Sequence, residues 1–329
     1  MSEKTDDRSY KGIFGALYML REFIQTFVDE PWVETLETSN LELMGTEFVD
    51  KRLIASSQDL LFKVKREEDP ALFVVMLEFQ KKPDKYMALR MLHYLCTVYL
   101  SLLGRDRKQR NSLLREGKLP PLFPVVLYKG RRVWGAAKEV SELIDSGFWE
   151  EGERLGFLRQ YMPRFRYLCI DQERLSDEFL EEKGTLVSAL FFMERVGRDG
   201  IESEKEDLAR VARLMEPHLK SDEGRRTVWR ILERFRVLSG LGKMENREAV
   251  VAKLESIVEV KTMLEETMEK IKAKARHEGE VLGMEKGKIE GKMEQKVETA
   301  IRLLNKGHTP QEVAEIVDLP EEEIKKLLH

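Results

Sequence analysis

Hydrophobic and polar positions change their spacing several times along the first 170 residues of the chain. Residues 10–28 place apolar side chains mostly three or four positions apart, which predicts a helix with one buried face. A second helix is expected from about Asp84 to Leu103, and Gly104 would end it. Short apolar runs predict extended segments at 41–50, 57–65, 71–80, 123–130 and 165–170. Strands that alternate with helices in this way predict an α/β domain with a mixed sheet.

Strand patterns end near residue 175, and the rest of the chain is predicted to be all helical. Residues 205–275 have the spacing of successive amphipathic helices. The next segment, 276–298, carries glycines four positions apart at Gly279, Gly283, Gly287 and Gly291. Each glycine would cost a helix about 1 kcal/mol relative to alanine, so the stripe needs an explanation. Either two helices, from two copies of the chain, approach closely along it, or the segment is a weak, charged linker.

The last 30 residues predict a small helical hairpin. Thr309 and Glu312 can form a capping box, with Pro310 at the first helical position. From Lys306 to the end there are six acidic residues against three lysines, whereas a helix that reads DNA should be basic. We therefore expect an interaction or dimerisation role. The regions predicted along the chain are 1–195 (α/β), 196–275 (helical), 276–298 (glycine-spaced) and 299–329 (hairpin).

The composition constrains the class of protein. With 329 residues and 42% hydrophobic content the chain can bury a substantial core, and a net charge of −4 does not by itself predict a nucleic-acid binder. Cys96 and Cys169 lie among apolar residues without a CxxC motif, so we expect two buried, reduced thiols and no zinc. Neither a signal peptide nor an apolar run of roughly 18 residues occurs, which predicts a soluble, cytoplasmic protein without membrane contact.

The segment VVMLEFQKK, residues 74–82, combines a core-like strand with polar side chains. Glu78 and Gln80 fall on one face of that strand because strand side chains alternate. If residues 57–80 form a hairpin whose loop centres between Glu68 and Asp69, Asp59 stands opposite Glu78. Facing Cβ atoms lie about 4.5–5.5 Å apart, close enough for two carboxylates to share Mg²⁺. A shift of two residues would keep the face but change the partner.

The alternative is structural. Asp59 and Glu78 would then be strand residues that face solvent or pair with lysines, for which Lys63 and Lys82 are available. The residues alone leave both interpretations open.

The order of elements resembles a known family. A helix, the strands SSQDLLFKV and VVMLEFQKK, a helix and LPPLFPVVLYKGRRVW occur in the order found in the Rpn family of recombination-promoting nucleases, also labelled putative transposases. The likeness covers roughly residues 8–190 and includes KPDKYMALRMLHYL. It implies a PD-(D/E)XK restriction-endonuclease-like mixed sheet flanked by helices, followed by an all-α C-terminal region.

The resemblance assigns roles to particular residues. It implies that Asp59 and Glu78 bind Mg²⁺ or Mn²⁺ and that Gln80 positions the attacking water. Gln80 stands where the wider superfamily has a lysine, and a neutral amide adds no charge to the transition state. The metal or a nearby lysine must then supply it, and Lys63 or Lys82 could serve, unless both are solvated edge lysines.

Two further residues on the following helix could support this site. Arg90 and Tyr94 are one helical turn apart. They could hold the metal-binding side chains in place, or they could pack the helix against the sheet.

The function implied is metal-dependent hydrolysis of DNA phosphodiester bonds with little sequence specificity, in recombination or mobile-element biology. DNA would be held by the loop 104–118 and the end of the next strand, through Arg105, Arg107, Lys108, Arg110, Arg131 and Arg132. The C-terminal helices would join two or more copies of the chain. The alternatives are an inactive nuclease-fold module for DNA binding or assembly, and a helical interaction protein whose α/β domain is a scaffold.

Overall fold

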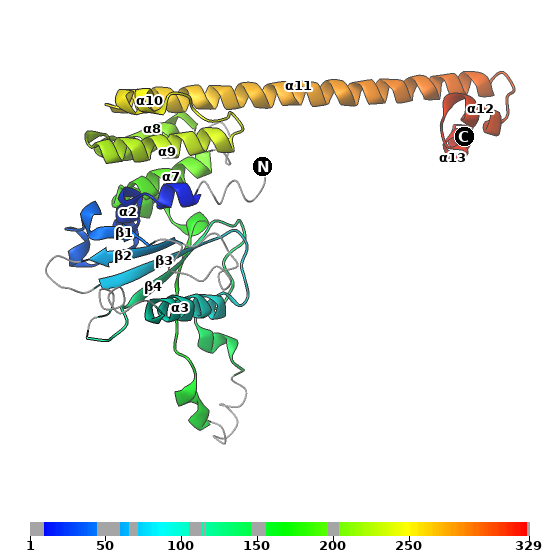
Figure 1. Cartoon of the computed structure of the whole chain (residues 1–329). Helices are drawn as coiled ribbons and strands as arrows, with labels where there is room; N and C mark the ends of the chain where they lie inside the picture. Colours follow the sequence, from blue (N-terminus) through cyan, green and yellow to red (C-terminus); the bar gives the residue numbers. More distant parts are fainter. Residues whose placement is uncertain are drawn as a thin grey trace. The chain divides into compact units, whose positions relative to one another are not determined.

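The computed structural model describes residues 10–44, 60–65, 72–104, 114, 116–145, 156–196 and 204–327 (Figure 1). The strands are β1 (Leu41–Leu43), β2 (Leu60–Lys65), β3 (Leu72–Gln80), β4 (Leu122–Tyr128) and β5 (Leu168–Asp171). The α-helices are α2 (Leu17–Phe27), α3 (Met87–Leu103), α6 (Asp177–Lys183), α7 (Leu186–Val196), α8 (Glu204–Met215), α9 (Asp222–Leu238), α10 (Arg247–Lys253), α11 (Ile257–Leu304), α12 (Pro310–Val317) and α13 (Glu321–Lys326). Short 3-10 helices lie at Pro31–Val33, Thr38–Asn40, Val140–Leu143, Gly156–Tyr161, Gln172–Arg174 and Glu216–Lys220.

The five strands form one mixed sheet in the order β1-β2-β3-β4-β5. The first three are antiparallel to one another, and β3, β4 and β5 are parallel. The predicted mixed α/β sheet followed by a helical region is therefore confirmed. The predicted hairpin register is confirmed as well, because Leu60 pairs with Leu77 and Lys65 with Leu72.

Alternating side chains of β3 pack on opposite faces of the sheet. Met76 belongs to the core that packs against α3. Phe79 points to the other face, where its ring lies 5.7 Å from the ring of Tyr10 between centroids. Since every second residue shares a face, Glu78 and Gln80 lie on the α3 side of the sheet with Met76.

The N-terminal helical segment is interrupted where one helix over 10–28 was predicted. Residues 10–14 are helical, and α2 begins only at Leu17. Between them Ala16 has an extended backbone with ψ of 128°, directly after Gly15, which is a weak helix former. The single predicted helix is therefore wrong, although both pieces bury apolar side chains.

Helix α3 ends at Gly104 as predicted but begins at Met87, three residues later than expected. Cys96 on this helix is exposed and Cys169 is partly buried, and both are free. The prediction of two buried thiols is wrong for Cys96, because apolar neighbours in sequence do not share its face of a helix.

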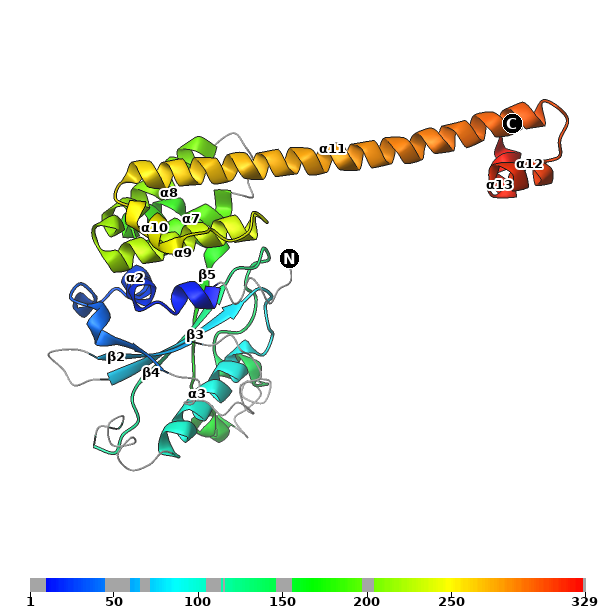
Figure 2. The same ribbon diagram turned by 45° about the horizontal axis from the view of Figure 1, so that its top comes forward.

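A layer of helices covers the sheet face opposite α3, and Figures 1 and 2 show α2 between the sheet and helices α7 and α9. Inside this layer Arg234 of α9 donates two hydrogen bonds, of 3.0 and 2.8 Å, to Glu194 of α7. Their side chains are 2% and 9% exposed. Glu194 also accepts from Gln172 at 2.8 Å and from Tyr10. These four residues, the buried ion-pair network, join the N-terminal helix, the end of β5 and two helices of the layer.

The chain divides into two compact units, Met1–Glu265 and Glu266–His329. The finer boundaries predicted from the sequence stay predictions. The glycine-spaced segment 276–298 is helical and part of α11. Apart from the helix's own backbone, no described atom lies within 4 Å of where a Cβ would stand on any of its four glycines. Close pairing with a second copy of the chain stays a prediction.

The predicted terminal hairpin is confirmed. Helices α12 and α13 pack with the end of α11 around Ala300, Val313, Val317 and Ile324. The Thr309 hydroxyl accepts from the backbone N–H of Glu312, and the Glu312 carboxylate accepts from the N–H of Thr309, so the capping box is present. Among the described residues, no helix has the length and apolar character needed to cross a membrane.

Candidate active site at the end of strand β3

Glu78 lies near the carboxyl end of β3, and its side chain is fully buried. Gln80 Nε2 donates a hydrogen bond of 2.5 Å to Glu78 Oε1. This contact confirms the predicted placement of the two side chains on one strand face. The amide of Gln80 therefore holds one oxygen of the Glu78 carboxylate in place.

The first turn of α3 brings a guanidinium next to Glu78. Arg90 Nη2 lies 3.5 Å from Glu78 Oε1 and donates a hydrogen bond of 2.8 Å to the Tyr94 hydroxyl. The Arg90 Cζ atom lies 5.6 Å from the centre of the Tyr94 ring. Arg90 and Tyr94 are thus brought to the Glu78 side of the sheet, and Arg90 carries the charge opposite to that of Glu78.

Asp84 is a member of this cluster that the sequence reasoning missed. It lies in the turn between β3 and α3, where its Oδ1 accepts from the backbone N–H of Tyr86 at 2.9 Å. Its Oδ2 accepts from Arg90 Nη1 at 2.6 Å. Burial opposes ionisation of Asp84, but the hydrogen bonds from Arg90 and Tyr86 and the charge of Arg90 hold its pKa below the ordinary value. An aspartate three residues before the first residue of a helix was the available signal, because such residues commonly bond the backbone two positions on.

The two oxygens of the Glu78 carboxylate have different surroundings. Glu78 Oε2 is buried and has no hydrogen-bond partner among the described residues. A buried acceptor without a partner is unfavourable, and a divalent cation would satisfy it. The described ranges contain no group of three or more His, Cys, Asp or Glu side chains that could hold a metal. Mg²⁺ does not need such a group, since one or two carboxylates with waters and a phosphate commonly suffice. The donors present therefore fit Mg²⁺ or Mn²⁺.

Asp59, the other predicted metal ligand, lies outside the described residues. Strand β2 is described from Leu60, which pairs with Leu77. This register is the one from which Asp59 was predicted to face Glu78, and that pair stays a prediction.

The two lysines predicted as sources of positive charge have different surroundings. Lys63 Nζ lies 3.7 Å from Glu42 Oε2 on β1, and its partner position on β3 is Val74, four residues before Glu78. Four residues correspond to about 13 Å along a strand. Strand β3 ends at Gln80, so the predicted strand-face placement of Lys82 is wrong; Lys82 lies exposed in the bend that follows. Their catalytic roles stay predictions.

Two of the predicted DNA contacts follow β4. Arg131 and Arg132 are exposed just beyond Gly130, where a Cβ would lie 2.5 Å from the carbonyl oxygen of Lys81. Only glycine allows this close approach of the two strand ends, which carries both arginines to the edge of the sheet where β3 ends. The other predicted contacts, Arg105, Arg107, Lys108 and Arg110, lie outside the described residues.

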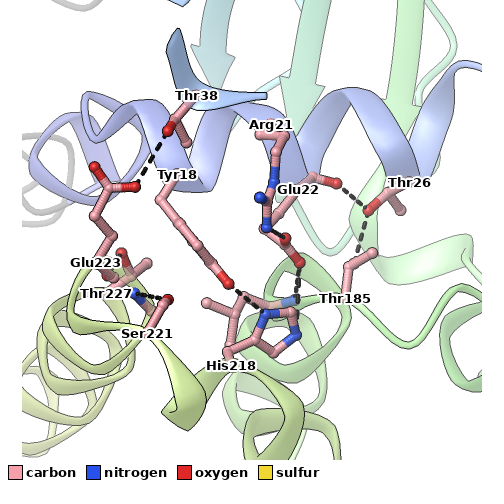
Figure 3. A network of polar contacts seen from close by, with 12 residues as sticks. Tyr18, Arg21, Glu22, Thr26, Thr38, Thr185, His218, Ser221, Glu223 and Thr227 are labelled. Atoms are coloured by element: carbon pink, nitrogen blue, oxygen red, sulfur yellow. Dashed lines mark hydrogen bonds and ion pairs between the residues drawn. The ribbon is translucent and has the colours of Figure 1, made fainter. Parts of the chain in front are cut away.

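A second group of buried polar side chains joins α2 to the helical layer (Figure 3). Glu22 accepts hydrogen bonds from Arg21 at 2.8 Å and from the backbone N–H of Leu186 at 3.1 Å. His218 Nε2 lies 3.6 Å from Glu22 Oε2, and His218 Nδ1 lies 3.0 Å from the Tyr18 hydroxyl. Burial lowers the pKa of His218, although the Glu22 charge acts the other way. The sequence carried no signal for this group, because Tyr18 and His218 are 200 residues apart.

Comparison with known proteins points to one family. The family model described as "Putative transposase, YhgA-like" matches residues 4–223. Recombination-promoting nuclease RpnD of Escherichia coli O157:H7 is 26% identical over 136 residues, which are 40% of this chain and 49% of that protein. Recombination-promoting nuclease RpnC of Escherichia coli strain K12 is 29% identical over 110 residues, 33% of this chain and 34% of that protein.

A third relative has a different label. "Putative inactive recombination-promoting nuclease-like protein YjiP" of Escherichia coli strain K12 is 31% identical over 78 residues, 24% of this chain and 76% of that protein. The chain thus spans about half of RpnD and a third of RpnC. No solved structure matches it.

Proposed function

The chain belongs to the YhgA-like putative transposase family, and on that premise we propose that it is a metal-dependent endonuclease that hydrolyses DNA phosphodiester bonds. Relatives named recombination-promoting nucleases support a nuclease that acts in recombination or on mobile elements. The observation that carries the proposal is the buried Glu78 carboxylate. Gln80 and Arg90 contact one of its oxygens, and the other has no hydrogen-bond partner among the described residues.

We infer that the sheet is the core of a PD-(D/E)XK nuclease. The antiparallel pair β2-β3, the helix α3 and the parallel strand β4 follow one another in the order that the resemblance implies. In this interpretation the candidate site lies on the α3 side of the sheet, at the end of β3.

Glu78 and Asp59 would hold Mg²⁺ or Mn²⁺, with Glu78 Oε2 as one ligand atom. When bound, the cation would lower the pKa of a water and draw negative charge from the scissile phosphate. Gln80 would orient that water, because its amide oxygen can accept a hydrogen bond while its nitrogen donates to Glu78. The amide is neutral, so this step positions the water without adding charge.

DNA would be held through its phosphates. The basic residues proposed for this contact are Arg105, Arg107, Lys108, Arg110, Arg131 and Arg132. Contacts of this kind fix the position of the duplex but carry little sequence information, so we expect low specificity.

We also propose that the exposed part of α11 pairs with a second copy of the chain. Val281, Leu282, Met284, Ile289 and Met293 on this helix are 40–76% exposed, which is unusual for large apolar side chains along one segment. The four glycines would allow close approach of the two helix backbones.

A second candidate is an inactive nuclease-fold protein that binds DNA or serves in assembly. Two observations support this second candidate. The name of the relative YjiP calls that protein inactive, and Gln80 carries no charge. The two candidates differ in whether DNA is cut.

The test is a nicking assay with supercoiled plasmid and the full-length chain, in Mg²⁺, Mn²⁺ or EDTA. We expect nicking with either cation and none in EDTA. Glu78→Gln and Asp59→Asn should each slow nicking by about 100-fold or more. Glu181→Gln is the matched control, since this carboxylate on α6 is 48% exposed and pairs with Arg210, outside the candidate site. Equal nicking by wild type and Glu78→Gln would refute the proposal, and DNA binding without nicking in any cation would favour the inactive alternative.

A further inference from the structure

We propose that Arg90 is a catalytic residue of this site, which supplies to the scissile phosphate the positive charge that Gln80 lacks. Asp84 and Tyr94 are the residues that position it. This inference rests on the proposed nuclease function and deepens it, because it names the group that replaces the lysine found in the wider superfamily.

The charge requirement comes from the chemistry. Negative charge spreads over the phosphate oxygens in the transition state, and a fixed cation beside them lowers the barrier. Gln80 lies beside Glu78 but is neutral. Lys63 is paired with Glu42, four residues along the sheet from the level of Glu78. Arg90, by contrast, lies 3.5 Å from Glu78 Oε1.

The guanidinium is held by groups other than Glu78. Arg90 donates at 2.6 Å to Asp84 and at 2.8 Å to Tyr94, and Asp84 is fixed in turn by the backbone N–H of Tyr86. Both distances are typical of strong hydrogen bonds, whereas 3.5 Å to Glu78 is too long for one. Arg90 is therefore oriented by its two neighbours and only attracted by Glu78.

The same arrangement leaves Arg90 able to bind an anion. A guanidinium has five N–H donors, and the bonds to Asp84 and Tyr94 use two of them. The side chain is 35% exposed, so a phosphate can reach it from solvent, whereas Glu78 is fully buried. Arginine also pairs with phosphate oxygens in a two-pronged geometry that a lysine does not offer.

The charges of Glu78 and Asp84 are also consistent with a role of Arg90 in binding phosphate. Without substrate, Arg90 balances the buried charge of Glu78 at 3.5 Å. If Glu78 held a divalent cation, its attraction for Arg90 would be weaker, and the Arg90 donors not bonded to Asp84 and Tyr94 would be available to the phosphate. Because its pKa is lowered, Asp84 stays ionised at neutral pH and keeps Arg90 in position.

The decisive experiment removes the positive charge of Arg90 on α3 and introduces one at position 80 on β3. Arg90→Gln should lower the single-turnover nicking rate by about 100-fold. Adding Gln80→Lys to this variant should restore at least a tenth of the wild-type rate, because the new cation stands beside Glu78. Arg90→Lys should keep part of the activity, and Asp84→Asn should lower the rate less than Arg90→Gln does.

A matched control separates this role from fold stability. Arg226→Gln removes an arginine that is 38% exposed and lies 2.7 Å from a carboxylate on α9, far along the chain from the site. It should leave nicking unchanged. Because Arg90→Gln removes the cation beside the buried Glu78, it should lower the thermal midpoint, so all rates are measured at a temperature at which circular dichroism shows every variant folded. If Arg90→Gln nicks at the wild-type rate, or if Gln80→Lys restores nothing, the inference is overturned.

A binding measurement keeps the inference testable without cleavage. In Ca²⁺, the affinity for a fluorescent duplex would be followed by anisotropy against salt concentration. Loss of one phosphate contact should reduce the slope of log affinity against log salt by about 0.9 for Arg90→Gln. If the wild type cuts no DNA but this slope falls, the nuclease function fails while the phosphate contact stands. An unchanged slope overturns the contact itself.

Discussion

Loss of Arg234 would leave the charge of Glu194 buried without its cationic partner. The two side chains are 2% and 9% exposed and share two hydrogen bonds, of 3.0 and 2.8 Å. Removal of one partner from such a pair costs about 3–5 kcal/mol, because the remaining charge cannot return to water. We therefore expect Arg234→Met to lower the free energy of unfolding by about this amount.

A double variant distinguishes the pair from the packing around it. Glu194→Gln in the Arg234→Met background removes the stranded charge but keeps an acceptor for Gln172 and Tyr10. The double variant should therefore cost about 0.5–3 kcal/mol less than the sum of the two single variants.

Urea unfolding of the full chain, followed by tryptophan fluorescence and far-UV circular dichroism, measures these differences. The control is Arg226→Gln on the same helix, whose exposed ion pairs with Asp222 and Glu248 should contribute much less than the buried pair. The reasoning is refuted if the free energy of unfolding of Arg234→Met lies within about 1 kcal/mol of the wild-type value, or if Arg226→Gln lowers it as much. The buried ion-pair network would then not stabilise the packing of the helical layer on the sheet.

Three further predictions concern other parts of the chain. Truncation before residue 276 should convert an oligomer to a smaller species, and an unchanged mass by light scattering would contradict pairing through α11. Thr309→Ala should destabilise the terminal hairpin by about 1 kcal/mol, seen as a lower urea midpoint of that unit, because it removes the capping box. The pKa of His218 is lowered in the folded protein, so the unfolded chain takes up the proton more readily as the pH falls below about 6.5. Stability should therefore fall from about pH 7 to about pH 5 more steeply than in His218→Gln, and equal slopes in urea titrations would refute this.

The candidate site was only partly predictable. Glu78 and Gln80 could be placed on one face from strand alternation alone, and the hairpin register followed from a loop centre assumed between Glu68 and Asp69. The contact between Arg90 and Glu78 could not be predicted in this way, since it depends on the turn at Asp84 that sets where α3 starts. The predicted position of Lys82 on the strand face was wrong because β3 ends two residues before Lys82.

The elements that depend only on neighbouring residues were determined by the sequence itself. The strands, the end of α3 at Gly104 and the capping box at Thr309 each depend on residues within a few positions of one another, and local backbone preferences suffice to define them. Contacts between distant parts were decided only by the tertiary structure. Glu194 with Arg234, Glu22 with His218, and the exposure of Cys96 depend on which helix faces are brought together. Sequence spacing defines the faces of each helix, but the packing of the whole core selects which faces meet.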